Sequence, residues 1–472
     1  MIVGIDLGTT NSAIGAVIDG DPSLIPNALG EVLTPSVVGI DPKGTIVVGA
    51  EAAELQVTQP ERCASLFKRA MGTDRTYSLA DKKLTPIELS GLVLQRLRED
   101  AESHLGKQVE NAVITVPAYF NENQRRATIC AGELAGLRVE RIINEPTSAA
   151  IAYGLHDSQT ERVCVIFDLG GGTFDVSVVD HFEGVVEVRA SSGECFLGGE
   201  DFSAAIVSGV LQQRGLMLEQ AEMKTPAMVS RLRHLCELAK RELSTKVKAT
   251  VRMPERDGSI LAEAEVIEIS LEDFRRWTEK TVARLERPVR KALGDAQLNR
   301  FDIDSVVLVG GATRMPMVKE YVSRNFECSI DSRLNPDEVV AIGATIQAGL
   351  IARDEAVDDI VVTDVAPFTL GVETTKQFGA ELREGYFSPI IERNTTIPVS
   401  RSSVFQTVAA NQAEMNISIY QGESRMVKDN LYLGEFRVIG IPPGPAGESV
   451  SMRFTYDLNG VLEAEATVLT TG

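Results

Sequence analysis

Two loops of similar sequence contain residue types that could bind the phosphates of a nucleotide. GIDLGTTNS near the start of the chain and FDLGGGTFD further along each contain Asp-Leu-Gly after an apolar run, then a turn of glycine or hydroxyl residues. A second apolar run follows each turn, which predicts two β-hairpins. The backbone N–H groups of such a turn point outward with no side chain in the way, which suits phosphate oxygens.

One aspartate precedes each turn, Asp6 in the first loop and Asp168 in the second. Carboxylates in this position could hold a magnesium ion through water. A single glycine-rich turn would indicate only a hairpin, whereas two copies with the same Asp-Leu-Gly favour a functional pair. The sequence contains no GxxxxGK[ST] motif, and GGGTFD lies inside a hairpin and not before a long helix, so the other common phosphate loops are not supported.

Strands and helices alternate around these loops. Residues 111–120 read as a strand and 121–137 as a helix, and a further strand is followed by a helix that begins at Pro146. Residues 228–244 have apolar side chains at the spacing of an amphipathic helix, and 305–322 read as strand, glycine turn and helix. This alternation predicts α/β layers as far as about residue 350.

The pattern changes after an acidic segment, residues 354–367, which reads as a linker. Beyond it, apolar residues recur with a period of two. Val450, Met452, Phe454 and Tyr456 are predicted to share one face of a strand, and Asn459-Gly460 predicts a type I′ hairpin turn before the return strand. The end of the chain is therefore expected to be an antiparallel β domain.

Composition limits the classes of partner. The chain has 472 residues, enough for two or three domains, and its formal net charge of -20 argues against nucleic acid or an anionic membrane as a partner. No stretch of 18 apolar residues occurs, and the chain opens directly on a strand with no leader-like segment. Its six widely spaced cysteines predict buried free thiols. We expect a cytoplasmic protein.

Nine motifs resemble those of one family and occur in its order. They are GIDLGTTNS, VPAYFNENQR, NEPTSAAIAYGL, FDLGGGTFDVS, FLGGEDF, LAKRELS, VLVGGATRMP, NPDEVVAIGA and RNTTIP. The chain resembles the seventy-kilodalton heat-shock (DnaK-like) chaperones, and is nearest to their HscC branch. The resemblance implies an actin-like (RNase H-like) two-lobed ATPase domain in residues 1–353, a linker in 354–366, and an antiparallel β-sandwich peptide-binding domain in 367–472.

The resemblance also implies the residues of an ATP/ADP and magnesium site, with potassium as a further candidate cation. Its catalytic residues would be Lys68, Glu145, Asp168, Thr173 and Asp6, with Asp6 and Asp168 holding the metal through water. The other nucleotide-binding residues would be Thr9, Thr10, Asn11, Gly170, Gly171, Gly172, Asp175, Gly198, Gly199, Glu237, Lys240, Arg241, Ser244, Gly310, Gly311, Arg314 and Asp337. Taken singly, Lys68 would be a solvated helix lysine and Glu145 an acid favoured by a helix N-terminus.

The β domain would bind extended apolar segments of unfolded proteins, and ATP would control their release. The implied peptide-lining residues are Val372, Thr374, Thr375, Phe405, Val408, Met415 and Ile417, although any of them could instead be sandwich core. Pro117, Arg125, Arg141 and the linker residue Asp364 match positions that couple the domains, and the first three are also tied to J-domain co-chaperones. The function would belong to protein folding and the stress response.

Several departures from the family pattern qualify these expectations. The region between Lys68 and VPAYF is short, which leaves the nucleotide-exchange partner open. Thr363 in the linker predicts weaker docking, Thr375 and Val408 predict altered peptide specificity, and no helical lid precedes Gly472, where we expect a truncation. The alternative functions are an actin-superfamily small-molecule kinase, which would not need the β-rich tail, and a filament-forming actin relative.

Overall fold

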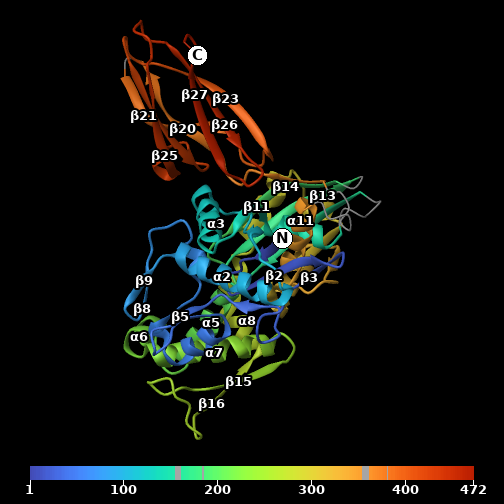
Figure 1. Ribbon diagram of the computed structural model, residues 1–472. Coiled ribbons are helices and arrows are strands. Elements are labelled where there is room, and N and C mark those ends of the chain that lie inside the picture. Colours follow the sequence, from blue (N-terminus) through green and yellow to red (C-terminus); the bar gives the residue numbers. More distant parts are fainter. Residues whose placement is uncertain (155–160, 183–184, 353–360, 380, 472) are drawn as a thin grey trace.

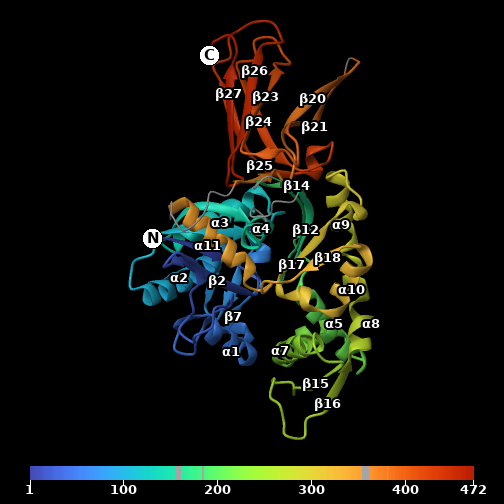
Figure 2. The same ribbon diagram turned by 90° about the vertical axis from the view of Figure 1, so that its right-hand side faces the viewer.

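The computed structural model describes residues 1–154, 161–182, 185–352, 361–379 and 381–471. It is a mixed α/β structure. Figure 1 shows the β-rich end of the chain as a separate layer of strands that stands on the rest of the molecule, and Figure 2 shows two α/β lobes beneath it. No helix in the described part of the chain is long and apolar enough to cross a membrane.

The first lobe is built on a sheet in the order β11-β10-β1-β2-β3, with β4 pairing with β2. Its strands are β1 (Ile2–Asp6), β2 (Asn11–Ile18), β3 (Asp21–Leu24), β4 (Thr34–Pro35), β10 (Asn111–Val116) and β11 (Arg138–Asn144). Smaller sheets are formed by β5 (Val38–Ile40), β6 (Ile46–Val48) and β7 (Cys63–Ala64), and by β8 (Tyr77–Leu79) and β9 (Lys82–Leu84). β1 and β2 are antiparallel, so the first predicted hairpin is confirmed.

Five helices pack on this lobe, and their ends follow the sequence signals. They are α1 (Ala50–Thr58), α2 (Pro86–Leu105), α3 (Glu122–Leu134), α4 (Glu145–Ala152) and α11 (Val339–Ala352). Asn121 and Gln124 form a capping box that starts α3. The helix that was expected to begin at Pro146 begins one residue earlier, at Glu145. α11 returns from the second lobe and lies so close to β1 that a Cβ at Gly4 would be 2.2 Å from the Thr345 nitrogen.

The second lobe is built on a sheet in the order β18-β17-β12-β13-β14-β19-β22. Its strands are β12 (Arg162–Leu169), β13 (Phe174–Phe182), β14 (Val185–Glu194), β17 (Ser305–Val309), β18 (Ser329–Asp331), β19 (Val361–Val365) and β22 (Thr396–Ile397). Its helices are α5 (Gly199–Gln212), α6 (Leu218–Lys224), α7 (Pro226–Leu243), α8 (Leu271–Ala283), α9 (Glu286–Asp295) and α10 (Pro316–Asn325). β12 and β13 form the second predicted hairpin, and β15 (Lys248–Arg252) pairs with β16 (Val266–Ser270).

The second half of the expected linker is a strand. Residues 354–360 lie outside the described part of the chain, but β19 pairs in parallel with β14 through Val361–Thr363 and antiparallel with β22 through Asp364 and Val365. Since β22 belongs to the β-rich end of the chain, this sheet continues from the second lobe into that end. Thr363 is paired in register with Glu187.

The β-rich end contains two sheets around one core. One has the order β21-β20-β24-β25 and the other β23-β26-β27. The strands are β20 (Leu370–Phe378), β21 (Glu381–Ile391), β23 (Val399–Gln406), β24 (Glu414–Gln421), β25 (Leu431–Ile439), β26 (Ser449–Tyr456) and β27 (Leu462–Val468). Val450, Met452, Phe454 and Tyr456 are fully buried between the sheets, as their alternation predicted.

Two smaller expectations were wrong. Of Asn459 and Gly460, only Gly460 has a positive φ, 66°, so their turn is not type I′, which needs positive φ at both residues. The Asp457 carboxylate accepts hydrogen bonds from the Asn459 and Val461 N–H groups and holds a wider loop instead. The six cysteines are free, but only Cys164 and Cys236 are buried. Cys63, Cys195 and Cys328 are partly buried, and Cys130 is exposed because α3 turns Ala127 and Ala131 toward the core.

Candidate nucleotide and peptide sites

A cleft between the two lobes collects most of the predicted phosphate-binding residues. Its lining comes from both hairpin turns, from the start of α4 and from the loops after β17. The lining residues are Asp6, Gly8, Thr9, Thr10, Asn11, Leu33, Lys68, Glu145, Asp168, Gly170, Gly171, Thr173, Val309, Gly310, Gly311, Pro336, Asp337 and Val340. The sequence therefore predicted residues that meet in space although they lie far apart along the chain.

The two hairpin turns touch each other at the bottom of this cleft. A Cβ added at Gly171 would lie 2.4 Å from the Thr10 side chain, and one added at Gly172 would lie 2.4 Å from Thr9. Contacts this short are not tolerated by real side chains, so glycine is required at both positions. The backbone N–H groups of the two turns are thereby brought to one place.

Three carboxylates lie around this place. Asp168 and Asp175 are buried and Asp6 is half-buried, and Asp6 and Asp168 line the cleft whereas Asp175 does not. Asp6 accepts a hydrogen bond from the Thr115 hydroxyl at 2.8 Å, and Asp175 accepts one from the Tyr119 N–H at 3.3 Å. Burial, with the nearby Glu145 carboxylate, raises the pKa of Asp6 to about 6 and that of Asp175 to about 8, and raises the pKa of Asp168 well above its ordinary value. One oxygen each of Asp168 and Asp175 is buried without a hydrogen-bond partner. Buried carboxylate oxygens that lack a hydrogen-bond donor are suited to interact with a cation.

Lys68 and Glu145 form a buried ion pair beside these carboxylates. The Lys68 Nζ lies 2.7 Å from Glu145 Oε1, and the two side chains are 4% and 10% exposed. Lys68 also lies over the Phe120 ring, 5.7 Å from its centre. The alternative interpretation of Lys68 as a solvated helix lysine is therefore wrong, since burial of an ammonium group requires a partner.

The residues predicted to contact adenosine lie on α7 and on the loops after β17. Lys240 lies near the phosphate loops, because its Nζ donates hydrogen bonds to the Gly199 carbonyl at 2.9 Å and to Ser203 at 3.0 Å, and lies 2.6 Å from Glu237. Arg241 is exposed and paired with Glu237, and the Ser244 hydroxyl donates to its own helix.

The opposite wall is made by the loop after β17 and by the loop between β18 and α11. Arg314 pairs with Asp337 at 2.9 Å, and Gly310 has a φ of 80° that favours glycine. Gly310, Gly311 and Asp337 line the cleft, whereas Arg314 and the four α7 residues do not reach its lining. Gly198 and Gly199 stand behind the second turn, where a Cβ at Gly198 would meet the Gly172 nitrogen at 2.5 Å.

Only some of the predicted peptide-lining residues are accessible. Val372 and Ile417 are 1% and 5% exposed and belong to the sandwich core, with Phe405 and Met415 packed against that core. The Thr374 hydroxyl donates to the Tyr386 carbonyl, and Thr375 lies at a register shift between β20 and β21. Val408 is 56% exposed in the loop after β23.

A gap opens between β20 and β24 next to these residues. The two strands pair only through Leu370–Val372 and Ile419–Gln421, and beyond that point the β20–β21 hairpin diverges from the sheet (Figure 2). β24 continues to pair with β25 as far as Glu414. The facing edges of β20 and β24 are therefore unpaired with each other on both sides of the gap.

The predicted coupling residues meet at the boundary between the first lobe and the β domain. Arg125 donates hydrogen bonds to Asn144 Oδ1 at 2.6 Å and to the Asn459 carbonyl at 3.4 Å. Asp364 accepts hydrogen bonds from Asn144 and Thr147. Burial lowers the pKa of Arg141, which lies near Asp457. Pro117 is buried directly after β10.

Sequence reasoning missed several contacts at this boundary. Glu122 accepts a hydrogen bond from the Leu462 N–H, and Gln421 accepts one from the Glu122 N–H. On the other lobe, Arg393 forms a bidentate ion pair with Asp295 at 2.5 and 2.6 Å. The partners in each of these contacts lie at least 98 residues apart in the sequence, and no local pattern marks them. The motif RNTTIP contained Arg393 but did not identify its partner.

The comparisons with known proteins agree with these motifs. The family described as Hsp70 protein matches residues 2–78 and 75–472. The chain is 43% identical to the chaperone protein DnaK of Thermotoga petrophila and 42% identical to that of Thermosipho africanus, over its whole length and over 79% and 78% of theirs. The HscC branch stays a prediction. The chain belongs to the Hsp70 family of ATP-hydrolysing molecular chaperones.

Proposed function

We propose that residues 1–353 form an actin-like, two-lobed domain that hydrolyses ATP in the cleft, that 354–366 is the linker, and that 367–472 is a β-sandwich that binds client peptides. One observation carries the first part of the proposal. The turns at Thr9–Thr10 and Gly171–Gly172 meet within van der Waals distance beside the buried or half-buried carboxylates and the Lys68–Glu145 pair. This arrangement offers N–H donors, a cation site and a buried ammonium group to one phosphate chain.

The carboxylates fit a magnesium ion held largely through water. Their ligand atoms are all oxygen, and two of those oxygens are buried without a partner. No three His, Cys, Asp or Glu side chains in the described ranges come close enough to bind a metal directly. Waters and phosphate oxygens would have to complete the coordination by Asp6 and Asp168. When bound, magnesium would neutralise phosphate charge, and potassium is a further candidate beside it.

The chain's own residues would position the attacking water and the terminal phosphate. The Lys68 ammonium is fixed by Glu145 and can donate to a phosphate oxygen. Glu145 presents a carboxylate to the cleft that can orient a water molecule, and Thr173 also lines the cleft, whereas Asp175 does not reach its lining. Hydrolysis of a phosphoanhydride requires mainly such positioning and charge stabilisation.

The gap between β20 and β24 is the best place for a client peptide. An extended peptide that enters it can pair with two strand edges, and Met415 on β24 supplies apolar surface along one of them. Phe405 on β23 and Val408 in the loop after it are the other apolar contacts that we propose. Unfolded polypeptides expose such segments. Val372 and Ile417 would act from beneath, by shaping the core under the gap. The family also suggests a J-domain co-chaperone near Arg125, Arg141 and Pro117, and a cytoplasmic location.

The first test replaces Lys68 by alanine. We expect Lys68→Ala to lower single-turnover ATP hydrolysis by about a hundredfold or more while a fluorescent ATP analogue binds within a fewfold of wild type, since one preorganised charge stabilises the transition state by about 3 kcal/mol. Lys107→Ala, at an exposed position, is the matched control. Loss of nucleotide binding with no change in the rate per bound ATP would contradict the role proposed for Lys68.

A further inference from the structure

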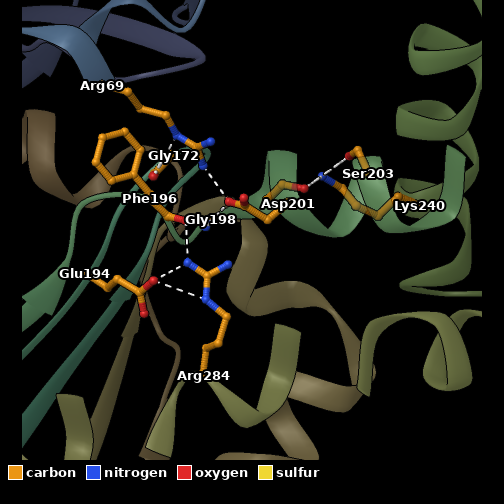
Figure 3. A network of polar contacts seen from close by, with 10 residues as sticks. Arg69, Gly172, Glu194, Phe196, Gly198, Asp201, Ser203, Lys240 and Arg284 are labelled. Atoms are coloured by element: carbon orange, nitrogen blue, oxygen red, sulfur yellow. Dashed lines mark hydrogen bonds and ion pairs between the residues drawn. The ribbon is translucent and has the colours of Figure 1, made fainter. Parts of the chain in front are cut away.

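Arg69, the residue after Lys68, crosses from the first lobe to the second. Both residues lie in the 3₁₀ turn Phe67–Ala70, but Lys68 stays in its own lobe with Glu145. The Arg69 Nε donates to the Gly172 carbonyl at 2.9 Å, and its Nη2 lies 2.5 Å from Asp201 Oδ2 (Figure 3). The two charged side chains are only 16% and 23% exposed. This pair is thus partly shielded from water, where charge-assisted hydrogen bonds are strongest.

Both partners of Arg69 belong to the second phosphate turn and its support. Asp201 lies in the first turn of α5, and the same oxygen that binds Arg69 accepts the Gly198 N–H at 2.8 Å. The start of α5 is bonded to the phosphate turn itself, through Gly199 N–H to the Gly170 carbonyl and Glu200 N–H to the Gly171 carbonyl, both at 2.9 Å. Arg69 therefore contacts the turn directly and also through α5.

The bond to the Gly172 carbonyl has a consequence for the next N–H group. In a trans peptide the C=O of Gly172 and the N–H of Thr173 point in opposite directions. A guanidinium group that holds the carbonyl on one side therefore turns the Thr173 N–H to the other side. Thr173 lines the cleft and Arg69 does not. The Thr173 N–H therefore points away from Arg69.

We propose that Arg69 is a positioning residue: it fixes the orientation of the second phosphate turn and holds the lobes together around the bound nucleotide. This inference rests on the proposed ATPase function. It assigns Arg69 no contact with the nucleotide. It acts through the Gly172 carbonyl and through Asp201, and its position next to Lys68 means that parting the lobes would separate Lys68 from the second turn at the same time.

The experiment compares Arg69→Ala, Arg69→Lys and a control, Arg96→Ala. Arg96 also forms an ion pair with an aspartate, Asp100, but within α2 and away from the cleft. We expect Arg69→Ala to lower the single-turnover rate of ATP hydrolysis by at least tenfold and to speed release of fluorescent ADP by a similar factor. Its melting temperature should change no more than that of Arg96→Ala. Arg69→Lys can keep the ion pair but not both bonds, and should recover only part of the rate.

A second variant tests the contact of Arg69 with Asp201 apart from its contact with the Gly172 carbonyl. Asp201→Asn keeps an oxygen for the Gly198 N–H but removes the charge, so it should speed ADP release, and combining it with Arg69→Ala should add little. This variant also decides the matter if Arg69→Ala does not fold. Hydrolysis and ADP release at wild-type rates in Arg69→Lys and Asp201→Asn would overturn the inference. A wild-type chain that neither binds nor hydrolyses ATP would instead overturn the proposed function.

Discussion

At the scale of single residues, the cleft concentrates charge that is unfavourable without a ligand. Asp168 and Asp175 are buried and Asp6 is half-buried, and each has a raised pKa because the charged form loses hydration and meets other carboxylates. Lys68 supplies a buried cation near them, and the buried Arg125 is a second near Asp175. Binding of a divalent cation and a nucleotide at this site should therefore raise the free energy of unfolding of the protein.

A pH dependence of magnesium stabilisation follows from these carboxyl groups. The folded protein keeps protons on Asp6 up to about pH 6 and on Asp175 up to about pH 8, whereas the unfolded chain loses them near pH 4, so stability falls as pH rises through this window. Magnesium favours the ionised forms and offsets that loss.

In melting experiments with ADP present, we therefore expect magnesium to raise the melting temperature by a few degrees more at about pH 8 than at about pH 6, relative to EDTA. Asp168→Asn should reduce the difference. An equal magnesium effect at both pH values would contradict this assignment of the carboxylates.

The sequence allowed some of these residues to be predicted and not others. Asp6 and Asp168 were found because the Asp-Leu-Gly pattern occurs twice. Arg69 and Asp201 were not, because their importance comes from a contact between segments 132 residues apart, which no local pattern marks. Among the peptide candidates, alternation along β24 identified Ile417 as apolar but could not distinguish a core position from a binding surface.

At the scale of elements, the close approach of the two hairpin turns is what lets both of them face one phosphate chain. Gly171 and Thr10 are in such close contact that an added methyl group has no room, whereas a Cβ at Gly170 would have its nearest neighbour 3.8 Å away. The strands on either side of the second turn pair over a long stretch, since β12 pairs with β13 from Arg162 to Leu169. Each turn is therefore fixed by its own sheet, and the distance between the turns depends on how the two lobes are placed.

Gly171→Ala should therefore impair nucleotide binding far more than Gly170→Ala. We expect the affinity for ATP to fall by at least tenfold in the first variant, because its methyl group displaces Thr10, and by a fewfold at most in the second, which makes ordinary van der Waals contacts. Isothermal titration with ATP and magnesium measures both. Equal losses would mean that backbone flexibility, and not the spacing of the turns, limits binding.

Helices and strands were easier to predict from the sequence than the turns that connect them and the pairings between distant strands. Period-two alternation located β26, and the helical pattern with a glycine near its end located α3, because these signals are local. The Asn459 turn was predicted wrongly, because the Asp457 carboxylate stabilises a wider loop that a dipeptide rule does not consider. The strand β19 was missed because its pairing partners, β14 and β22, lie in different parts of the chain.

At the scale of the whole molecule, the β domain contacts both lobes. It stands on the α/β part of the molecule (Figures 1 and 2). It reaches the first lobe through the Asn459 turn and Leu462, and the second through Arg393 and Asp295. A body attached to two lobes at once is sensitive to the angle between them, and nucleotide in the cleft acts on the same angle. This is the physical basis on which we expect ATP and peptide to influence each other.

Asn459→Ala tests that coupling by removing the side-chain oxygen that accepts the Ile142 N–H at 3.0 Å across the boundary. We expect basal hydrolysis and peptide affinity with ADP to stay near wild type, and the acceleration of peptide release by ATP to fall several-fold, as one hydrogen bond of about 1 kcal/mol is lost. Fluorescent peptide release measures this, with Lys428→Ala, an exposed position in the same domain, as control. Binding linkage is reciprocal, so the factor by which peptide weakens ATP affinity relative to ADP has to fall equally. Full ATP-induced release in Asn459→Ala would mean that the contacts of Arg393 and Glu122 suffice for coupling without this turn.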